Sequence, residues 1–253
     1  MEIYKLIADL NNLGIKENDT IIVHSSYKAL CGNEKIEGGP QAVIEALKNL
    51  VKSGTLMLPT LSYESVTAEN RIFDVLNTPG CVGILPEVMR KSKDVYRSVH
   101  PTHSIAVWGK DAQKIAEEHI KDFTPVGPNS PLHELKRRKG KIVMLGCTLK
   151  PNTSMHGIEE MAAPEYLYGA NYDYTLVLSD GKTQKADILS HNFNDVEQRY
   201  ERILDVLDKT DYTFGKALNA DCYVLDAEAL WEKVLKKLKE APFYFVDKKD
   251  VQQ

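Results

Sequence analysis

Short, β-branched apolar segments alternate with amphipathic helices in this chain, and that alternation limits the folds open to it. Residues Glu2–Leu13 place apolar side chains at helical spacing, and Thr20–His24 is then predicted to be a buried strand. A second amphipathic helix opens at Pro40 and is followed by a second strand-like segment, Thr55–Thr60. The clearest strand of the chain is Lys141–Cys147. Helices and strands in this order are typical of an α/β protein.

The chain of 253 residues shows no linker, internal repeat or low-complexity tract, so we expect one domain over residues 1–253. Late in the chain, Asp180-Gly181 separates two strand-like segments, Tyr174–Leu178 and Thr183–Leu189, which is a strong hairpin signal. A charged helix is expected over Asp195–Leu207. The predicted architecture is a single three-layer α/β/α sandwich with a mixed sheet and a late β-hairpin.

The composition argues against several classes of function. The chain carries 32 Lys and Arg against 36 Asp and Glu, a net charge of −4, whereas nucleic-acid-binding domains are usually strongly basic. No apolar run approaches the ~20 residues of a membrane span, and the acidic second residue does not fit a secretory signal. The four cysteines form no CxxC pair, so neither a zinc ribbon nor a thioredoxin-type site is indicated. We expect a cytoplasmic protein with no nucleic-acid or membrane partner.

The segment after the strand Lys141–Cys147 carries the strongest candidates for chemistry. Open α/β sheets bind their ligands beyond the carboxyl ends of their strands. Asn152 or Thr153 is a natural helix N-cap here, which puts His156 and Glu159 one turn apart on one helix face. A carboxylate beside an imidazole fixes its tautomer and stabilises the imidazolium, as a general base requires. Spacing alone leaves a half-buried histidine with a surface glutamate as the alternative.

The segment 97–104 is a second candidate, rich in histidine and hydroxyl groups. His100 and His103 are three residues apart, but Pro101 excludes a continuous helix through them and so disfavours a helical pair of metal ligands. No further ligand lies in a tight local pattern, and we predict no metal site. Arg97 and the neighbouring hydroxyls could hold a phosphate, whereas a polar connection capped by its own side chains is the alternative.

Two glycines and two serines mark further candidate contacts. Gly38 and Gly39 precede a predicted helix N-terminus, which attracts anions through free N–H groups and the helix dipole. They match neither a Walker A sequence nor a GxGxxG fingerprint, so nucleotide binding is not indicated. Ser25 and Ser26 follow the first strand without a GxSxG turn, which gives a serine hydrolase only weak support.

Seven short motifs occur together in a fixed order along the chain. Their combination resembles the aminoglycoside 3-N-acetyltransferase family, which lies outside the GNAT superfamily and has an α/β sandwich fold of its own. The resemblance runs from about Thr20 to Phe245, nearly the whole chain. The motifs are His24-Ser25-Ser26, Gly38-Gly39, Gly54-Thr55-Leu56 with Pro59-Thr60, Asn77-Thr78-Pro79, Arg97-Ser98 with His100-Pro101-Thr102-His103-Ser104, Ser130-Pro131-Leu132, and Asn152-Thr153-Ser154-Met155-His156 with Glu159.

The resemblance implies transfer of an acetyl group from acetyl-CoA, as co-substrate, to a primary amine of an aminoglycoside or related amino sugar. It assigns His156 as the base, Glu159 as the carboxylate that orients it, and Thr153 to the threonine position of the family's T-x-x-H-x-x-E stretch. Because no cysteine lies in this motif, direct transfer in a ternary complex is expected. The coenzyme A pocket is expected to draw on Ser25, Ser26, Gly38, Gly39, Arg97, Ser98, His100 and Ser104.

Other readings of the same residues stay open. A hydrolase could use Ser25 or Ser26, or a metal held by His100 and His103, and a CoA-binding protein could keep the fold without turnover. The oxyanion donors, the acceptor amine and the oligomeric state are also open, with a homodimer as one option. The loop 62–80 and the segment 166–194 are expected to shape the acceptor site.

Overall fold

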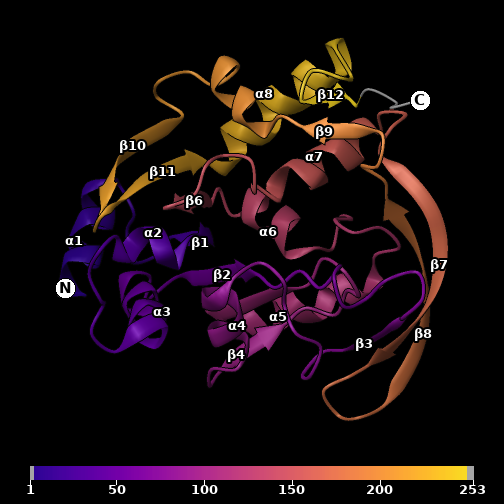
Figure 1. Ribbon diagram of the computed structural model, residues 1–253, viewed down its shortest axis with the longest axis horizontal. Coiled ribbons are helices and arrows are strands. Elements are labelled where there is room, and N and C mark those ends of the chain that lie inside the picture. The colour runs from indigo at the N-terminus through magenta and orange to yellow at the C-terminus, as the bar shows by residue number, and fades with distance from the viewer. Residues whose placement is uncertain (1–2, 250–253) are drawn as a thin grey trace.

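A computed structural model describes residues 3–249 and contains a seven-stranded mixed sheet (Figure 1). At its centre β1 pairs in parallel with β2 on one side and with β6 on the other. The flanking strands run antiparallel, with β5 against β2 and β11 against β6. The large mixed sheet predicted from the sequence is therefore confirmed. In spatial order its strands are β10 (Tyr212–Ala217), β11 (Ala220–Asp226), β6 (Lys141–Leu145), β1 (Thr20–Ser25), β2 (Thr55–Pro59), β5 (Ile105–Gly109) and β4 (Val95–Arg97).

Apolar side chains are buried on both faces of this sheet, because successive residues of a strand point to opposite faces. Ile21 and Val23 of β1 belong to one buried cluster, and Ile22 between them belongs to the other. The first cluster is covered by α1 (Tyr4–Asn12), α2 (Tyr27–Cys31), α3 (Gly39–Leu50) and α4 (Ile84–Arg90), and the second by α5 (Ala112–Glu118), α6 (Pro131–Arg137), α7 (Ser154–Ala162) and α8 (Ala227–Glu240).

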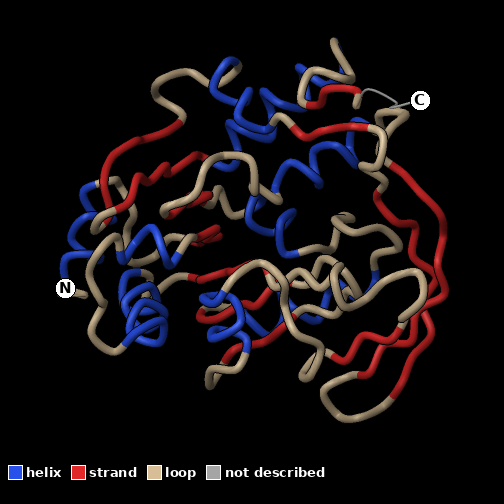
Figure 2. Tube along the Cα trace, viewed as in Figure 1, coloured by secondary structure: helices blue, strands red, loops and turns tan. Residues whose placement is uncertain are grey.

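A second, three-stranded sheet curves along one side of the molecule, where Figure 2 shows its strands in red. β7 (Tyr168–Val177) pairs antiparallel with β8 (Thr183–His191), and β3 (Ile72–Asp74) adds to β7 in parallel. Phe73 and Tyr174 belong to the small buried cluster of this sheet. The loop 62–80 is thus packed against β7 rather than free at the surface.

The helix predicted over Asp195–Leu207 is wrong. This stretch forms β9 (Val196–Gln198), which pairs with β12 (Val246–Lys248), and then a 3₁₀ turn over Tyr200–Asp205. Tyr200 and Ile203 are buried in the core, so tertiary packing overrides the local helical pattern. A second 3₁₀ turn, His119–Lys121, follows α5. Among the described residues, no helix has the length and apolar character needed to cross a bilayer.

Candidate active site

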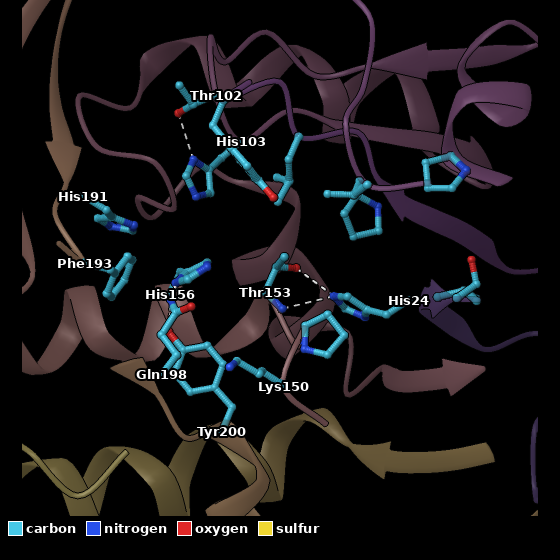
Figure 3. Close-up of a pocket in the computed structure, with 18 of the residues that line it drawn as sticks. His24, Thr102, His103, Lys150, Thr153, His156, His191, Phe193, Gln198 and Tyr200 are labelled. Atoms are coloured by element: carbon cyan, nitrogen blue, oxygen red, sulfur yellow. Dashed lines mark hydrogen bonds between the residues drawn. The ribbon is translucent and has the colours of Figure 1, made fainter. Parts of the chain in front are cut away.

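A cavity of about 510 Å³ opens at the carboxyl ends of β1 and β2, where α/β sheets bind their ligands. Ser25 and Pro59 end these two strands and contribute to the wall. Thr153 and His156 come from the start of α7, which follows the neighbouring strand β6 (Figure 3). His191 comes from the last residue of β8, so the small sheet closes one side of the cavity.

The His156 imidazole is held from one side by a buried carboxylate and a phenol. Its Nδ1 lies 3.4 Å from Oε2 of Glu159 and 3.2 Å from the hydroxyl oxygen of Tyr200. The Tyr200 hydroxyl donates to Glu159 Oε2 at 2.8 Å, and the Tyr166 hydroxyl donates to Oε1 at 2.9 Å. Burial and the nearby Glu159 charge raise the pKa of both phenols, so both remain protonated donors.

This arrangement fixes the orientation of the imidazole. Because Glu159 accepts and the Tyr200 hydroxyl spends its proton on that carboxylate, Nδ1 of His156 carries the ring proton of the neutral form. Nε2 then has a lone pair on the other edge of a ring that lines the cavity. Glu159 is fully buried, which rules out the alternative of a surface glutamate. The geometry is that of an oriented general base.

Thr153 is paired with a histidine to which the sequence had assigned no role. Nε2 of His24, the next-to-last residue of β1, lies 2.9 Å from Thr153 Oγ1 and accepts the Thr153 backbone N–H at 3.1 Å. Burial, with the nearby His156, lowers the pKa of His24 to about 3, so its ring is neutral. The Thr153 hydroxyl is thereby positioned at the cavity wall, at the N-terminal end of α7.

Two more histidines belong to the wall and were missed as site residues. His103 lies across the cavity from His156, with ring centroids 5.4 Å apart, and its Nδ1 is 2.8 Å from Thr102 Oγ1 (Figure 3). His191 lies 5.4 Å from His156 and donates from Nε2 to Glu160 at 2.8 Å. The motif around 100–103 carried a signal for His103, but residue spacing did not show which of its two imidazoles faces the cavity.

The residues predicted to bind coenzyme A fall into separate places. Ser25 lines the cavity, whereas Ser26 caps α2 by accepting the backbone N–H of Ala29. Gly38 and Gly39 begin α3 with positive φ angles, where glycine is favoured, and they do not line this cavity.

The segment 97–104 forms a buried network behind the wall. The Arg97 guanidinium donates to the carbonyl oxygens of Thr60 and Thr78 and to Ser104 Oγ, which ties the loop 60–80 to the sheet. Ser98 pairs with a ring nitrogen of His119, and Nδ1 of His100 accepts two backbone N–H groups of the next turn. The structure thus gathers Ser25, Thr153, His156 and Glu159 at one place, and it sets Arg97, Ser98, His100 and Ser104 behind that place.

Fold and cavity together define a class: an α/β protein with a carboxylate-held histidine at the carboxyl edge of its mixed sheet. A family model described as aminoglycoside 3-N-acetyltransferase matches residues 22–239. The chain therefore belongs to the aminoglycoside 3-N-acetyltransferase family, and with it to the acyltransferase enzymes. This confirms the family that the seven sequence motifs indicated.

Individual relatives are similar at moderate identity. The aminoglycoside N(3)-acetyltransferase IV of Salmonella sp is 30% identical over 191 residues, which are 74% of this chain and 69% of that protein. The aminoglycoside N(3)-acetyltransferase VII of Streptomyces paromomycinus is 31% identical over 176 residues, which are 62% of this chain and 60% of that protein. The crystal structure of the aminoglycoside acetyltransferase AAC(3)-IVa apoenzyme is similar with a TM-score of 0.78 and 26% identity, covering 96% of this chain and 90% of that one.

Proposed function

We propose that the protein transfers an acetyl group from acetyl-CoA directly to a primary amine of an aminoglycoside or related amino sugar, with His156 as general base. The observation that carries this proposal is the placement of His156. Its Nδ1 edge is engaged by Glu159 and Tyr200, and its ring lines the cavity. Family membership supplies the reaction class, and the held imidazole supplies the base that this class of reaction needs.

Each side chain has a distinct part in the proposed reaction. Nε2 of His156 removes a proton from the amine nitrogen as it attacks the thioester carbonyl, a contribution of typically 10²–10⁴-fold. Glu159 stabilises the imidazolium that forms, and its burial strengthens this attraction. The carbonyl oxygen becomes an oxyanion and needs hydrogen-bond donors. Of the hydroxyls considered, Ser25 and Thr153 line the cavity, whereas Ser104 is buried and donates to Thr60.

The two substrates are assigned by class. Acetyl-CoA is the proposed donor; Ser25 lines the reaction cavity, and Ser26, Gly38 and Gly39 are the other proposed contacts outside the buried network. Lys150 lies at the cavity wall with its side chain 52% exposed, where an ammonium can meet a phosphate. For the acceptor, the structure of an AAC(3)-IVa mutant is described as a complex with a gentamicin; that protein is 26% identical, with a TM-score of 0.80.

The proposed reaction requires one continuous scaffold. We propose that residues 1–253 form a single domain, a three-layer α/β/α sandwich in which the mixed sheet carries His24 and the hairpin β7–β8 carries His191. Helices on both sheet faces support the layered description, and the antiparallel pairing of β7 with β8 supports the hairpin.

The test is thiol release from acetyl-CoA across a panel of aminoglycosides and simple amino sugars, comparing the wild type with His156→Ala. We expect thiol release with at least one amine, and a loss of at least about 10²-fold in the variant. Coenzyme A should still stabilise the variant against heat. Near-normal turnover by His156→Ala would refute the assigned base. Thiol release without any amine would instead favour a hydrolase, and coenzyme A binding without any release would favour a binding protein.

A further inference from the structure

Three imidazoles meet in the cavity, and the proposed reaction uses only one of them. The ring centroid of His103 lies 5.4 Å from that of His156 and 5.3 Å from that of His191, and His156 and His191 are also 5.4 Å apart. All three side chains line the cavity wall. A cluster of three imidazoles around one cavity is more than a single general base requires.

The three rings differ in which nitrogen remains available. The side chain of His191 is 3% exposed, its Nε2 pairs with Glu160, and its Nδ1 is buried. His103 is partly exposed, and its Nδ1 is the nitrogen that pairs with Thr102. In Figure 3 the His103 ring reaches from the Thr102 side toward His156. His103 and His156 therefore turn their Nε2 edges toward the shared cavity from opposite sides.

The proton count of acetyl transfer calls for a second acceptor. An aliphatic amine arrives mainly as an ammonium, because its pKa lies above neutral pH. The ammonium must lose one proton before its nitrogen can attack and a second after the C–N bond forms. The departing thiolate takes up only one of them. One proton must therefore leave the cavity in every turnover, and a single imidazole would have to handle both in succession.

We propose that His103 is a second catalytic base, which takes the first proton from the acceptor ammonium while His156 takes the second. This inference rests on the proposed acetyl transfer. The ammonium passes one proton to Nε2 of His103, and the free amine attacks the thioester carbonyl. As the C–N bond forms, His156 accepts the second proton. When the C–S bond breaks, that proton passes to the thiolate, which leaves as thiol, and His103 releases its own proton to water.

The surroundings of His103 keep it ready to receive a proton. It faces His156 of α7 and His191 of β8, and His100 packs against it from its own segment with ring centroids 5.9 Å apart. The nearest buried carboxylate on that side, Glu160, is engaged by His191. Burial and these imidazoles lower the pKa of His103 well below its usual value, so the ring is neutral near pH 7 and gives up a captured proton readily.

The test compares wild type with His103→Asn, which removes the titrating ring and keeps a polar atom within reach of Thr102. The matched control is His133→Asn, since His133 is an imidazole on α6 outside the cavity. The acceptor is the panel member with the greatest thiol release from acetyl-CoA. kcat/KM is measured from below to above the pKa of its amine, and Tm is recorded for each variant.

We expect His103→Asn to lower kcat/KM about 10–100-fold at pH values where the acceptor is an ammonium. The deficit should shrink toward unity above the amine pKa, because no first proton then has to be removed. A folding defect would lower both ends of the profile equally, so a deficit constant across pH, or none at all, overturns the inference. If the wild type releases thiol with no amine, the proposed function fails and this inference fails with it.

Discussion

Two histidine–glutamate pairs share helix α7, and they differ in what the carboxylate holds. Glu159 pairs with His156 and accepts from two tyrosine hydroxyls. The next residue, Glu160, pairs with His191 and accepts from the Thr124 hydroxyl and the Val126 backbone N–H. Consecutive helix residues point about 100° apart, so adjacent glutamates reach different parts of the structure.

The contrast shows that a histidine–carboxylate pair is not by itself evidence of catalysis. Glu159 orients a ring whose free edge meets the cavity, whereas Glu160 joins the segment 124–126 and the end of β8 to α7. Burial raises the pKa of the Glu160 carboxyl, and its hydrogen bonds to Thr124 and Val126 oppose that rise. We therefore expect changes in the first pair to appear mainly in turnover and changes in the second mainly in stability.

The largest expected effect is on turnover in Glu159→Gln. The amide removes the charge that stabilises the His156 imidazolium and allows the wrong ring tautomer, so kcat should fall about 10²–10³-fold. Thiol-release kinetics at saturating acetyl-CoA measure it, with Glu160→Gln as the matched control on the same helix. Equal losses in the two variants would erase the distinction between the pairs.

Glu160→Gln is expected to lower the free energy of unfolding by about 1–3 kcal/mol, because buried donors lose a charged acceptor. Urea denaturation measures the change. The exposed carboxylate of Glu117 on α5 provides the control, and Glu117→Gln should stay within about 0.5 kcal/mol of wild type. A Glu160→Gln protein of unchanged stability would show that this pair is not a structural tie.

Acid should destabilise the protein through His191. Burial, with the nearby His156, lowers the folded-state pKa of His191 well below 6.5, so below pH 6.5 the unfolded chain binds a proton that the folded chain does not. The stabilisation is complete above pH 6.5 and is lost as the pH falls, by up to about 1.4 kcal/mol per pH unit. His191→Gln should flatten the slope of unfolding free energy against pH by up to one proton, and an unaltered slope contradicts this.

The smallest expected effect distinguishes the two phenols that bind Glu159. Tyr200→Phe removes a hydroxyl that touches both the carboxylate and Nδ1 of His156, and kcat should fall about 5-fold, the equivalent of ~1 kcal/mol. Tyr166→Phe removes a contact with Glu159 alone and should cost less. The reverse order of the two losses would place the orienting contact at Tyr166.

Local patterns predicted the elements that carry the site. The strand within 141–147 and the helix after it follow from the order of apolar and capping residues, and the pairing of His156 with Glu159 follows from helical geometry. The same reasoning failed at Asp195–Leu207, where burial of Tyr200 beside Glu159 decides the backbone course. It also gave no reason to choose His103 over His100, because the backbone between them turns.

The alternation of strands and helices and the one-turn spacing of base and carboxylate were determined by the sequence alone, since both depend on neighbouring residues. Tertiary structure alone decided that His24 meets Thr153 across 129 positions and that His191 meets Glu160 across 31. It also decided which glutamate would face the tyrosines. Such contacts depend on how distant segments pack around one cavity, and no local periodicity carries that information.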